Sequence, residues 1–205
     1  EMMEPAGFDP RAFLACYGMA ECTLAISFSP LWTGFTTHHI DADHLSEHHE
    51  AVLLGQNDTQ GRGRHFVNCG IPLPNFEVQI RDDDKVLGDW QSGVIYLRGP
   101  SVMSGYFNLA EETSHALCED GWLNTGDIGY LVDGVLTITG RKKDLIIVHG
   151  RNIWPQDLEH IAETQTEVRA GDAVAFSAPD SEGEELCVLM VQCRLSDPAK
   201  RSNLI

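Results

Sequence analysis

Two short motifs carry side chains suited to holding a sugar. Asp127 follows Gly126 in the run Thr125-Gly126-Asp127, and an aspartate on a glycine-supported turn can offer both carboxylate oxygens to a vicinal diol. Arg141 follows Gly140 at the end of a β-like run, where its guanidinium could reach the same diol. Each motif alone also fits an ordinary turn or a solvated arginine. The pair therefore suggests ribose recognition without establishing it.

A histidine cluster raises the question of a metal site. Its members are His38, His39, His44, His48 and His49. If a helix runs from Asp43 to Glu50, His44 and His48 lie one turn apart on the same face, at the spacing of a ligand pair. Nothing nearby completes such a site, so a solvated insertion is the interpretation that we favour.

Composition excludes several classes of partner. The net charge of −17 argues against nucleic acid and disfavours anionic membranes, although a nucleotide needs only local donors or a metal ion. No run approaches the roughly 18 apolar residues of a membrane span, and the opening Glu-Met-Met-Glu is not expected to be a signal peptide. The six cysteines show no CxxC spacing, which indicates reduced thiols without a catalytic role and predicts a cytoplasmic location.

Short β-like runs dominate the middle of the chain. Residues 76–80 alternate apolar and polar side chains, and residues 94–97 form a second predicted strand. Residues 129–132 and 135–139 flank Asp133-Gly134, which predicts a hairpin with a two-residue turn. We therefore expect a mostly antiparallel β subdomain over residues 66–140. Residues 33–65, rich in histidine, acidic residues and glycine, are expected to be the least structured part.

The pattern of apolar and polar residues changes after Gly140-Arg141-Lys142-Lys143-Asp144. Residues 145–148 predict a strand, and Gly150 predicts a turn. Trp154-Pro155 predicts the start of an amphipathic helix, which carries Leu158, Ile161 and Ala162. Residues 173–176 and 186–191 predict two further strands around an acidic loop. These elements indicate the opening of a small α+β domain.

Four motifs occur in order along the chain. They are Tyr17-Gly18-Met19-Ala20-Glu21, residues 99–106 (Gly-Pro-Ser-Val-Met-Ser-Gly-Tyr), Thr125-Gly126-Asp127 and Gly140-Arg141-Lys142-Lys143-Asp144, with Gly150 and Pro155 beyond. The set resembles the adenylate-forming superfamily of acyl-CoA synthetases, luciferases and peptide-synthetase adenylation domains. Residues 7–13, 16–24, 67–74 and 144–159 are most similar to fatty acyl-AMP ligases, and the resemblance covers nearly the whole chain.

The resemblance implies a partial adenylate-forming fold of mixed α/β and α+β class. Residues 1–141 would be the end of the large N-terminal domain, with a family-type insertion at 38–65 and the antiparallel β subdomain at 66–140. Residues 142–205 would begin the small, mobile C-terminal domain.

The resemblance also implies roles for individual residues. Tyr17 would place its ring against adenine, Glu21 would supply one oxygen to Mg²⁺, and Asp127 and Arg141 would bind the ribose hydroxyls. Gly18, Met19, Ala20 and Ile138 would complete the nucleotide site. A core tyrosine and a surface or helix-capping carboxylate are the plain alternatives for the first two positions.

Lys143 matches the hinge position of the family. Glu21 and Lys143 are the two residues expected to serve catalysis. A hinge residue absorbs a large φ/ψ change between two packed bodies, here between an adenylating and an acyl-transfer pose. Gly150 would let the backbone approach the active site. The alternative for Lys143 is an ordinary exposed lysine.

The implied reaction is attack of a fatty-acid carboxylate on the α-phosphorus of ATP, giving acyl-AMP and pyrophosphate. The acyl group would then pass to the phosphopantetheine thiol of an acyl carrier protein, as in lipid or polyketide biosynthesis. The family's phosphate loop and late lysine are absent from these residues, so this chain alone is expected to be inactive and to need the remainder of the enzyme.

Three alternatives stay open at this stage. The first is an acyl-CoA synthetase, or an adenylation domain for another carboxylic acid. The second is a non-catalytic nucleotide-binding or regulatory module, and the third is an inert structural fragment.

Overall fold

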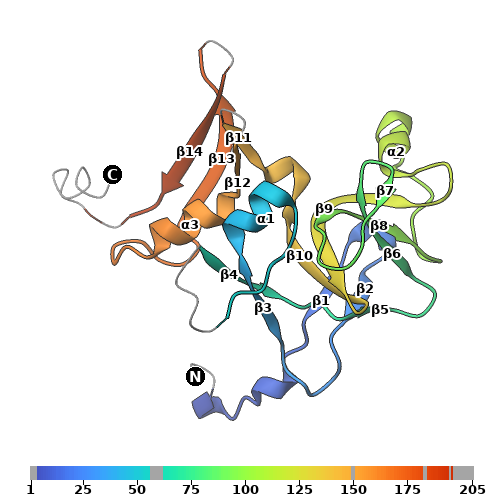
Figure 1. Cartoon of the computed structure of the whole chain (residues 1–205), viewed down its shortest axis with the longest axis horizontal. Helices are drawn as coiled ribbons and strands as arrows, with labels where there is room; N and C mark the ends of the chain where they lie inside the picture. Colours follow the sequence, from blue (N-terminus) through green and yellow to red (C-terminus); the bar gives the residue numbers. More distant parts are fainter. Residues whose placement is uncertain (1–3, 56–61, 149–150, 182–183, 194, 196–205) are drawn as a thin grey trace. The chain divides into compact units, whose positions relative to one another are not determined.

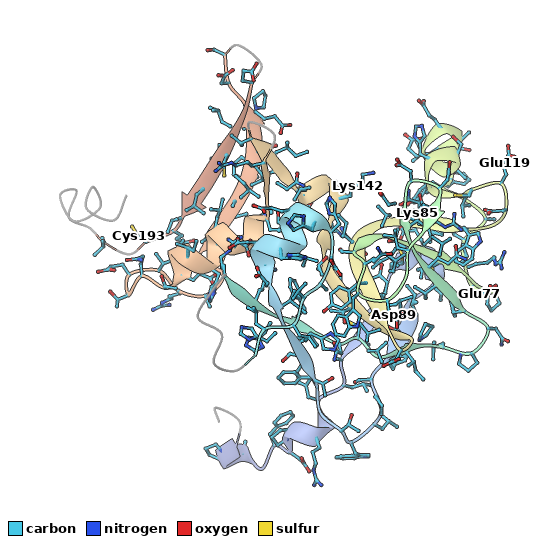
Figure 2. All side chains as sticks on the ribbon, in the orientation of Figure 1. Glu77, Lys85, Asp89, Glu119, Lys142 and Cys193 are labelled. Carbon is cyan, nitrogen blue, oxygen red and sulfur yellow. The ribbon has the colours of Figure 1, made fainter. Side chains whose placement is uncertain are left out.

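The computed structural model describes residues 4–55, 62–148, 151–181, 184–193 and 195. Its contacts divide the chain into two compact units, Glu1–Lys142 and Lys143–Ile205. Lys142, labelled in Figure 2, ends the first unit. None of the helices in these described ranges is long and apolar enough to span a membrane.

A five-stranded antiparallel sheet forms the centre of the first unit (Figure 1). Its order is β10 (Val135–Arg141), β9 (Leu123–Val132), β8 (Gly93–Arg98), β6 (Glu77–Asp82) and β7 (Lys85–Val86). The strands predicted at residues 76–80, 94–97, 129–132 and 135–139 are all confirmed. The alternation of apolar and polar residues predicts strands correctly here because every second side chain of a strand faces the same side of the sheet. The inward set forms a core that contains Ile80, Ile95, Leu97, Leu123 and Leu136.

The hairpin between β9 and β10 turns at Asp133-Gly134, as predicted. Both residues have positive φ, 49° and 77°, which is the conformation of a type I′ turn. Asp89, labelled in Figure 2, holds this turn by accepting a 2.9 Å hydrogen bond from the Asp133 amide. The turn therefore fixes the register of β9 and β10 as far as the pair of Gly129 and Ile138, and a register shift between Ile138 and Gly140 then places Arg141 opposite Asp127.

A smaller antiparallel sheet, β1-β2-β5, packs beside this core. It consists of β1 (Cys16–Gly18), β2 (Ala25–Phe28) and β5 (Ile71–Pro72), and the 3-10 helix η3 (Ala20–Cys22) connects β1 to β2. Gly70 leads into β5 with φ +80°, and a Cβ there would lie 1.8 Å from the Phe28 carbonyl oxygen. Glycine is therefore needed at this position, where the backbone passes close to the Phe28 carbonyl of β2.

The expectation that residues 33–65 are the least structured part is wrong for the described residues of that segment. β3 (Thr37–Asp41) pairs antiparallel with β4 (Gly63–Val67), and α1 (Ala42–His48) follows β3 directly (Figure 1). The Asp41 side chain caps α1 by accepting bonds from the Asp43 and His44 amides. Residues 56–61, which belong to the predicted loop, lie outside the described residues.

Apolar contacts across the chain explain why this segment is ordered. Ile40, Leu45 and Phe66 are buried in one cluster with Tyr130 of β9. This β3–β4 hairpin therefore depends on Tyr130, which is distant in sequence from both of its strands, and the polar local composition does not reveal this contact.

The short 3-10 helices and the helix α2 complete the first unit. They are η1 (Glu4–Ala6), η2 (Pro10–Ala12) and α2 (Ala110–Ala116), which follows the loop after β8. Asp9 caps η2 by accepting a bond from the Arg11 amide.

Among the described residues, the second unit contains every strand and helix predicted for it, together with a 3-10 helix and a short strand that were not predicted. These elements are η4 (Lys142–Asp144, which starts one residue before the unit), β11 (Ile146–Val148), β12 (Arg151–Ile153), α3 (Pro155–Glu163), β13 (Ala173–Pro179) and β14 (Glu185–Val191). β11 pairs with β12, and β13 pairs with β14. Pro155 stands at the first turn of α3, where its missing N–H costs no hydrogen bond. Gly150 lies outside the described residues, so its predicted turn stays a prediction.

Candidate functional site

Asp127 lies inside β9, whereas the sequence predicted a turn before the hairpin. The strand is kinked here, because Gly126 has φ 71° and the pairing of β8 with β9 shifts register between Val94 and Tyr96. The Asp127 amide donates to Thr125 Oγ1 at 3.0 Å, and that hydroxyl donates to the Ile95 carbonyl at 2.8 Å. Gly126 thus allows a kink within β9, and the hydrogen bonds through Thr125 hold the Asp127 backbone to the sheet.

Two side chains from other strands meet the Asp127 carboxylate, one of them distant in sequence. The Tyr17 hydroxyl donates to Oδ2 at 2.6 Å, across 110 residues of sequence. Arg141, the β10 partner of Asp127, donates from Nε to Oδ1 at 2.7 Å. The Asp127 side chain is 6% exposed and that of Arg141 is 52% exposed. The aspartate is therefore held rigidly at the sheet, while the arginine reaches the surface.

The arrangement leaves this carboxylate able to accept more hydrogen bonds. An ionised carboxylate offers about four lone-pair positions, and Tyr17 and Arg141 engage one oxygen each. Burial and the hydrogen bond to Asp127 both raise the pKa of Tyr17 well above its usual value. Its hydroxyl therefore stays protonated and remains a donor at physiological pH.

Glu21 lies on η3, close in sequence to Tyr17. Its Oε1 accepts a 2.8 Å bond from the Tyr106 hydroxyl, and its backbone carbonyl accepts from the Met103 amide at 2.7 Å. The bond to Glu21, together with burial, raises the pKa of Tyr106. The hydroxyl is therefore a neutral donor that leaves the negative charge on Glu21.

The chemistry of Glu21 fits the Mg²⁺ ion that the family implies. Within the described ranges no group of three or more His, Cys, Asp or Glu side chains could hold a metal ion, so a closed protein cage is not found there. Mg²⁺ bound to a nucleotide takes most of its ligands from phosphates and water, and one or two carboxylates suffice. A single carboxylate with a free lone pair meets that requirement.

The remaining predicted nucleotide-site residues flank Tyr17 and Glu21. A Cβ at Gly18 would lie 1.8 Å from the Leu24 carbonyl oxygen, so this position has a steric requirement of its own. Met19 and Ile138 pack against the core cluster that Tyr17 also contacts, and Ala20 is exposed at the start of η3. The structure therefore brings Tyr17, Asp127 and Arg141 into direct contact, and leaves the others as neighbours.

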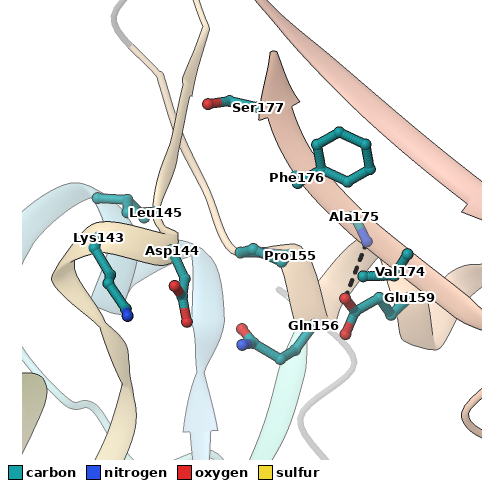
Figure 3. A pocket seen from close by; sticks show the side chains of 10 residues that line it. All are labelled: Lys143, Asp144, Leu145, Pro155, Gln156, Glu159, Val174, Ala175, Phe176 and Ser177. Atoms are coloured by element: carbon teal, nitrogen blue, oxygen red, sulfur yellow. Dashed lines mark hydrogen bonds between the residues drawn. The ribbon is translucent and has the colours of Figure 1, made fainter.

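Lys143 begins the second unit and is exposed. It lines an open cavity of about 360 Å³ together with Gln156 and Glu159 of α3 (Figure 3). Glu159 Oε1 accepts a 3.0 Å bond from the Ala175 amide of β13, so α3 and β13 form one wall of this cavity. The hinge role of Lys143 stays a prediction.

One of the clustered histidines, His38 of β3, packs against residues outside the β3–β4 hairpin. His38 Nδ1 lies 3.0 Å from the Tyr130 hydroxyl, and the His38 ring packs against Trp90 with a centroid distance of 5.1 Å. His44 and His48 do share one face of α1, with ring centroids 4.5 Å apart. The described residues add no third ligand to that pair.

Two functional candidates were missed by sequence reasoning. Tyr106 belongs to the quoted motif at residues 99–106, yet no role was given to it, and its partner Glu21 lies 85 residues away. Thr125 was seen only as part of a turn, although its hydroxyl links Asp127 to β8. A tyrosine directly after Gly105 was the one available signal for the first residue.

The family model described as "AMP-binding enzyme" matches residues 4–107, half of the chain. This chain belongs to the AMP-binding enzymes. Among curated relatives, a putative acyl-CoA synthetase of Caulobacter vibrioides is 46% identical over 206 residues, which cover all of this chain and 36% of the relative. A medium-chain-fatty-acid–[acyl-carrier-protein] ligase of Moorena producens is 35% identical over 94% of this chain and 34% of that protein.

Solved structures agree with this family assignment. One, from a study of fatty acyl-adenylate ligases from E. coli and L. pneumophila, superposes with a TM-score of 0.87 at 43% identity, over 99% of this chain and 36% of that chain. The predicted partial adenylate-forming fold and the likeness to fatty acyl-AMP ligases are thus confirmed. The chain spans about a third of the length of the relatives and structures that it matches.

Proposed function

We propose that this chain is part of an enzyme that converts a fatty acid and ATP to acyl-AMP and pyrophosphate. The observation that supports this most directly is the meeting of Tyr17, Arg141 and Asp127 at one carboxylate from three segments of the chain. Such a buried, pre-positioned aspartate beside an exposed guanidinium is suited to a sugar diol. The family and its fatty acyl-adenylate relatives supply the reaction class.

Each nucleotide-site residue then has a defined task. Asp127 accepts hydrogen bonds from the ribose hydroxyls, and Arg141 donates to the same sugar. Tyr17, with Gly18, Met19, Ala20 and Ile138, presents the surface against which adenine packs. Glu21 holds Mg²⁺, which when bound offsets the negative charge that develops on the phosphate oxygens.

The domain assignment belongs to the same proposal. Residues 1–141 form the end of the large adenylation domain, and residues 142–205 begin the small C-terminal domain, with Lys143 as the hinge between two poses. The family's phosphate loop and late lysine are supplied by other parts of the enzyme, so the isolated chain is inactive. A cytoplasmic location stays a prediction.

The proposed acceptor is the phosphopantetheine thiol of an acyl carrier protein. The Moorena relative is named as a ligase to acyl carrier protein, while the Caulobacter relative is named as an acyl-CoA synthetase. Coenzyme A is therefore the alternative acceptor, and the two differ in whether the phosphopantetheine arm is attached to a protein.

A chimaera tests the proposal. Residues 1–205 replace the matching segment of the Caulobacter relative, and fatty-acid-dependent ATP–pyrophosphate exchange is measured. Exchange is expected, with Asp127→Ala lowering it about a hundredfold, because two hydrogen bonds from the ribose to a charged acceptor are lost. Asp133→Asn, in the exposed hairpin turn, is the matched control and keeps the activity.

The outcomes separate the alternatives. A chimaera without exchange beside an active parent contradicts the adenylation proposal and favours a non-catalytic module. With an active chimaera, thioester formation is compared on carrier protein and on coenzyme A. Transfer to coenzyme A alone makes the chain part of an acyl-CoA synthetase.

A further inference from the structure

The segment at residues 99–106 is bonded to the 3-10 helix that carries Glu21. The Met103 amide donates to the Glu21 carbonyl at 2.7 Å. The Ser101 hydroxyl donates to the Cys22 carbonyl at 3.0 Å. With the Tyr106 hydroxyl on Glu21 Oε1, three hydrogen bonds join this segment to η3, although about 80 residues separate the two in sequence. The backbone and the side chain of Glu21 are therefore both fixed from the same loop.

Tyr106 is itself fixed by α2. Its amide donates to Thr113 Oγ1 at 2.9 Å, and that hydroxyl donates to the Leu109 carbonyl at 2.7 Å. Gly105 has φ +146°, and a Cβ there would lie 2.8 Å from Thr113 Cγ2, so only glycine allows the loop to approach α2 this closely. The Tyr106 ring therefore extends toward Glu21 from an anchored backbone.

Only one oxygen of the Glu21 carboxylate is used in this way. Oε1 accepts from Tyr106, while Oε2 accepts no hydrogen bond from the described part of the chain. The nature of the donor also matters. A lysine or arginine at this position would place a positive charge beside the carboxylate and weaken its attraction for a cation, whereas a phenol hydroxyl orients the carboxylate without neutralising it.

Resting on the proposed function, we propose that Tyr106 is a positioning residue that orients the Glu21 carboxylate toward the Mg²⁺ of the bound nucleotide. It acts through Glu21 and touches neither substrate nor metal. Partners of this kind, which orient a ligand by a hydrogen bond, typically change metal affinity about tenfold to a hundredfold when removed. The motif at residues 99–106 thereby gains a task in the nucleotide site.

The test uses the chimaera with the Caulobacter relative and two readouts. The first is the Mg²⁺ concentration that gives half-maximal ATP–pyrophosphate exchange. The second, independent of turnover, is the dissociation constant of ATP measured by calorimetry with Mg²⁺ and again with EDTA. Tyr106→Phe removes only the hydroxyl, and Ser114→Ala removes a hydroxyl from the exposed side of the neighbouring helix α2 as the control.

Tyr106→Phe is expected to raise the half-maximal Mg²⁺ concentration about tenfold to a hundredfold and to weaken binding of ATP with Mg²⁺. Binding with EDTA stays unchanged, and exchange recovers at high Mg²⁺. In the Glu21→Gln background the substitution has no further effect, because the two residues act as a unit. Ser114→Ala matches the wild type in both readouts.

Two results overturn this inference alone. One is a Tyr106→Phe protein with wild-type Mg²⁺ dependence, and the other is an equal loss of ATP binding with and without Mg²⁺, which indicates a merely structural role. A wild-type chimaera that lacks exchange overturns the proposed function and this inference with it.

Discussion

Replacing Tyr17 with phenylalanine removes the hydroxyl that donates to Asp127 Oδ2 at 2.6 Å. Asp127 is only 4% exposed, so water replaces that donor poorly. A hydrogen bond to a charged group contributes about 1.5–3 kcal/mol to stability. We therefore expect Tyr17→Phe to lower the free energy of unfolding by about 2 kcal/mol at pH 8.

The pH dependence of this loss makes the prediction specific. The folded-state pKa of Tyr17 is raised by burial and by Asp127, whereas in the unfolded chain it titrates near 10. A raised pKa gives stability that is present below the unfolded value and is lost as pH rises above it. The difference between wild type and Tyr17→Phe should therefore shrink above pH 10.

The assay is urea unfolding of the 205-residue chain, followed by far-ultraviolet circular dichroism at pH 8 and pH 10.5. Tyr106→Phe is the matched control, because it also removes a hydroxyl from a carboxylate, but from Glu21, which is less buried than Asp127. A Tyr17→Phe chain as stable as the wild type, or a stability difference that does not change with pH, refutes the reasoning.

Two further predictions concern the scaffold around the site. Gly70→Ala should cost about 2 kcal/mol or more in urea unfolding, because the residue has positive φ and its new Cβ would collide with the Phe28 carbonyl oxygen; a near-neutral result contradicts the close crossing. Burial lowers the pKa of His38, so its contribution to stability is present above the unfolded value near 6.5 and is lost as pH falls through the lowered one. The protection factors of the β3 amides, which correct for the slower intrinsic exchange at low pH, should therefore be lower at pH 5 than at pH 8 in the wild type. A variant with His38→Gln should lose most of that pH dependence, whereas one with the exposed His48→Gln should keep it.

Strand predictions succeeded where local chemistry decides the structure. The alternation at residues 76–80 and the turn pair Asp133-Gly134 both act within a few residues, so they can be recognised without knowing what packs against them. The expectation that residues 33–65 are unstructured was wrong for the opposite reason. Its polar, histidine-rich sequence is ordered because Ile40 and Phe66 pack with Tyr130, a contact that no local window contains.

The contacts of the candidate site likewise differ in how far they could be predicted from local sequence. Asp127 and Arg141 lie on the two strands of a hairpin whose turn can be recognised from the sequence, but a regular register would place Asp127 opposite Gly140. A register shift between Ile138 and Gly140 places it opposite Arg141, and neither this shift nor the kink at Gly126 was predicted. The bond between Tyr17 and Asp127 spans 110 residues, and the bond between Tyr106 and Glu21 spans 85. Only the motif order of a known family hinted at the first of these, and nothing local predicted the second.

The two donors on Asp127 have a consequence for ligand affinity. Immobilising a side chain at an interface costs about 0.5–1.5 kcal/mol of conformational entropy when it happens during binding. Tyr17 and Arg141 already hold the Asp127 carboxylate in the ligand-free chain. That ordering is completed when the sheet folds, so a sugar that reaches the carboxylate meets a preorganised acceptor, and more of its hydrogen-bond energy is retained as affinity.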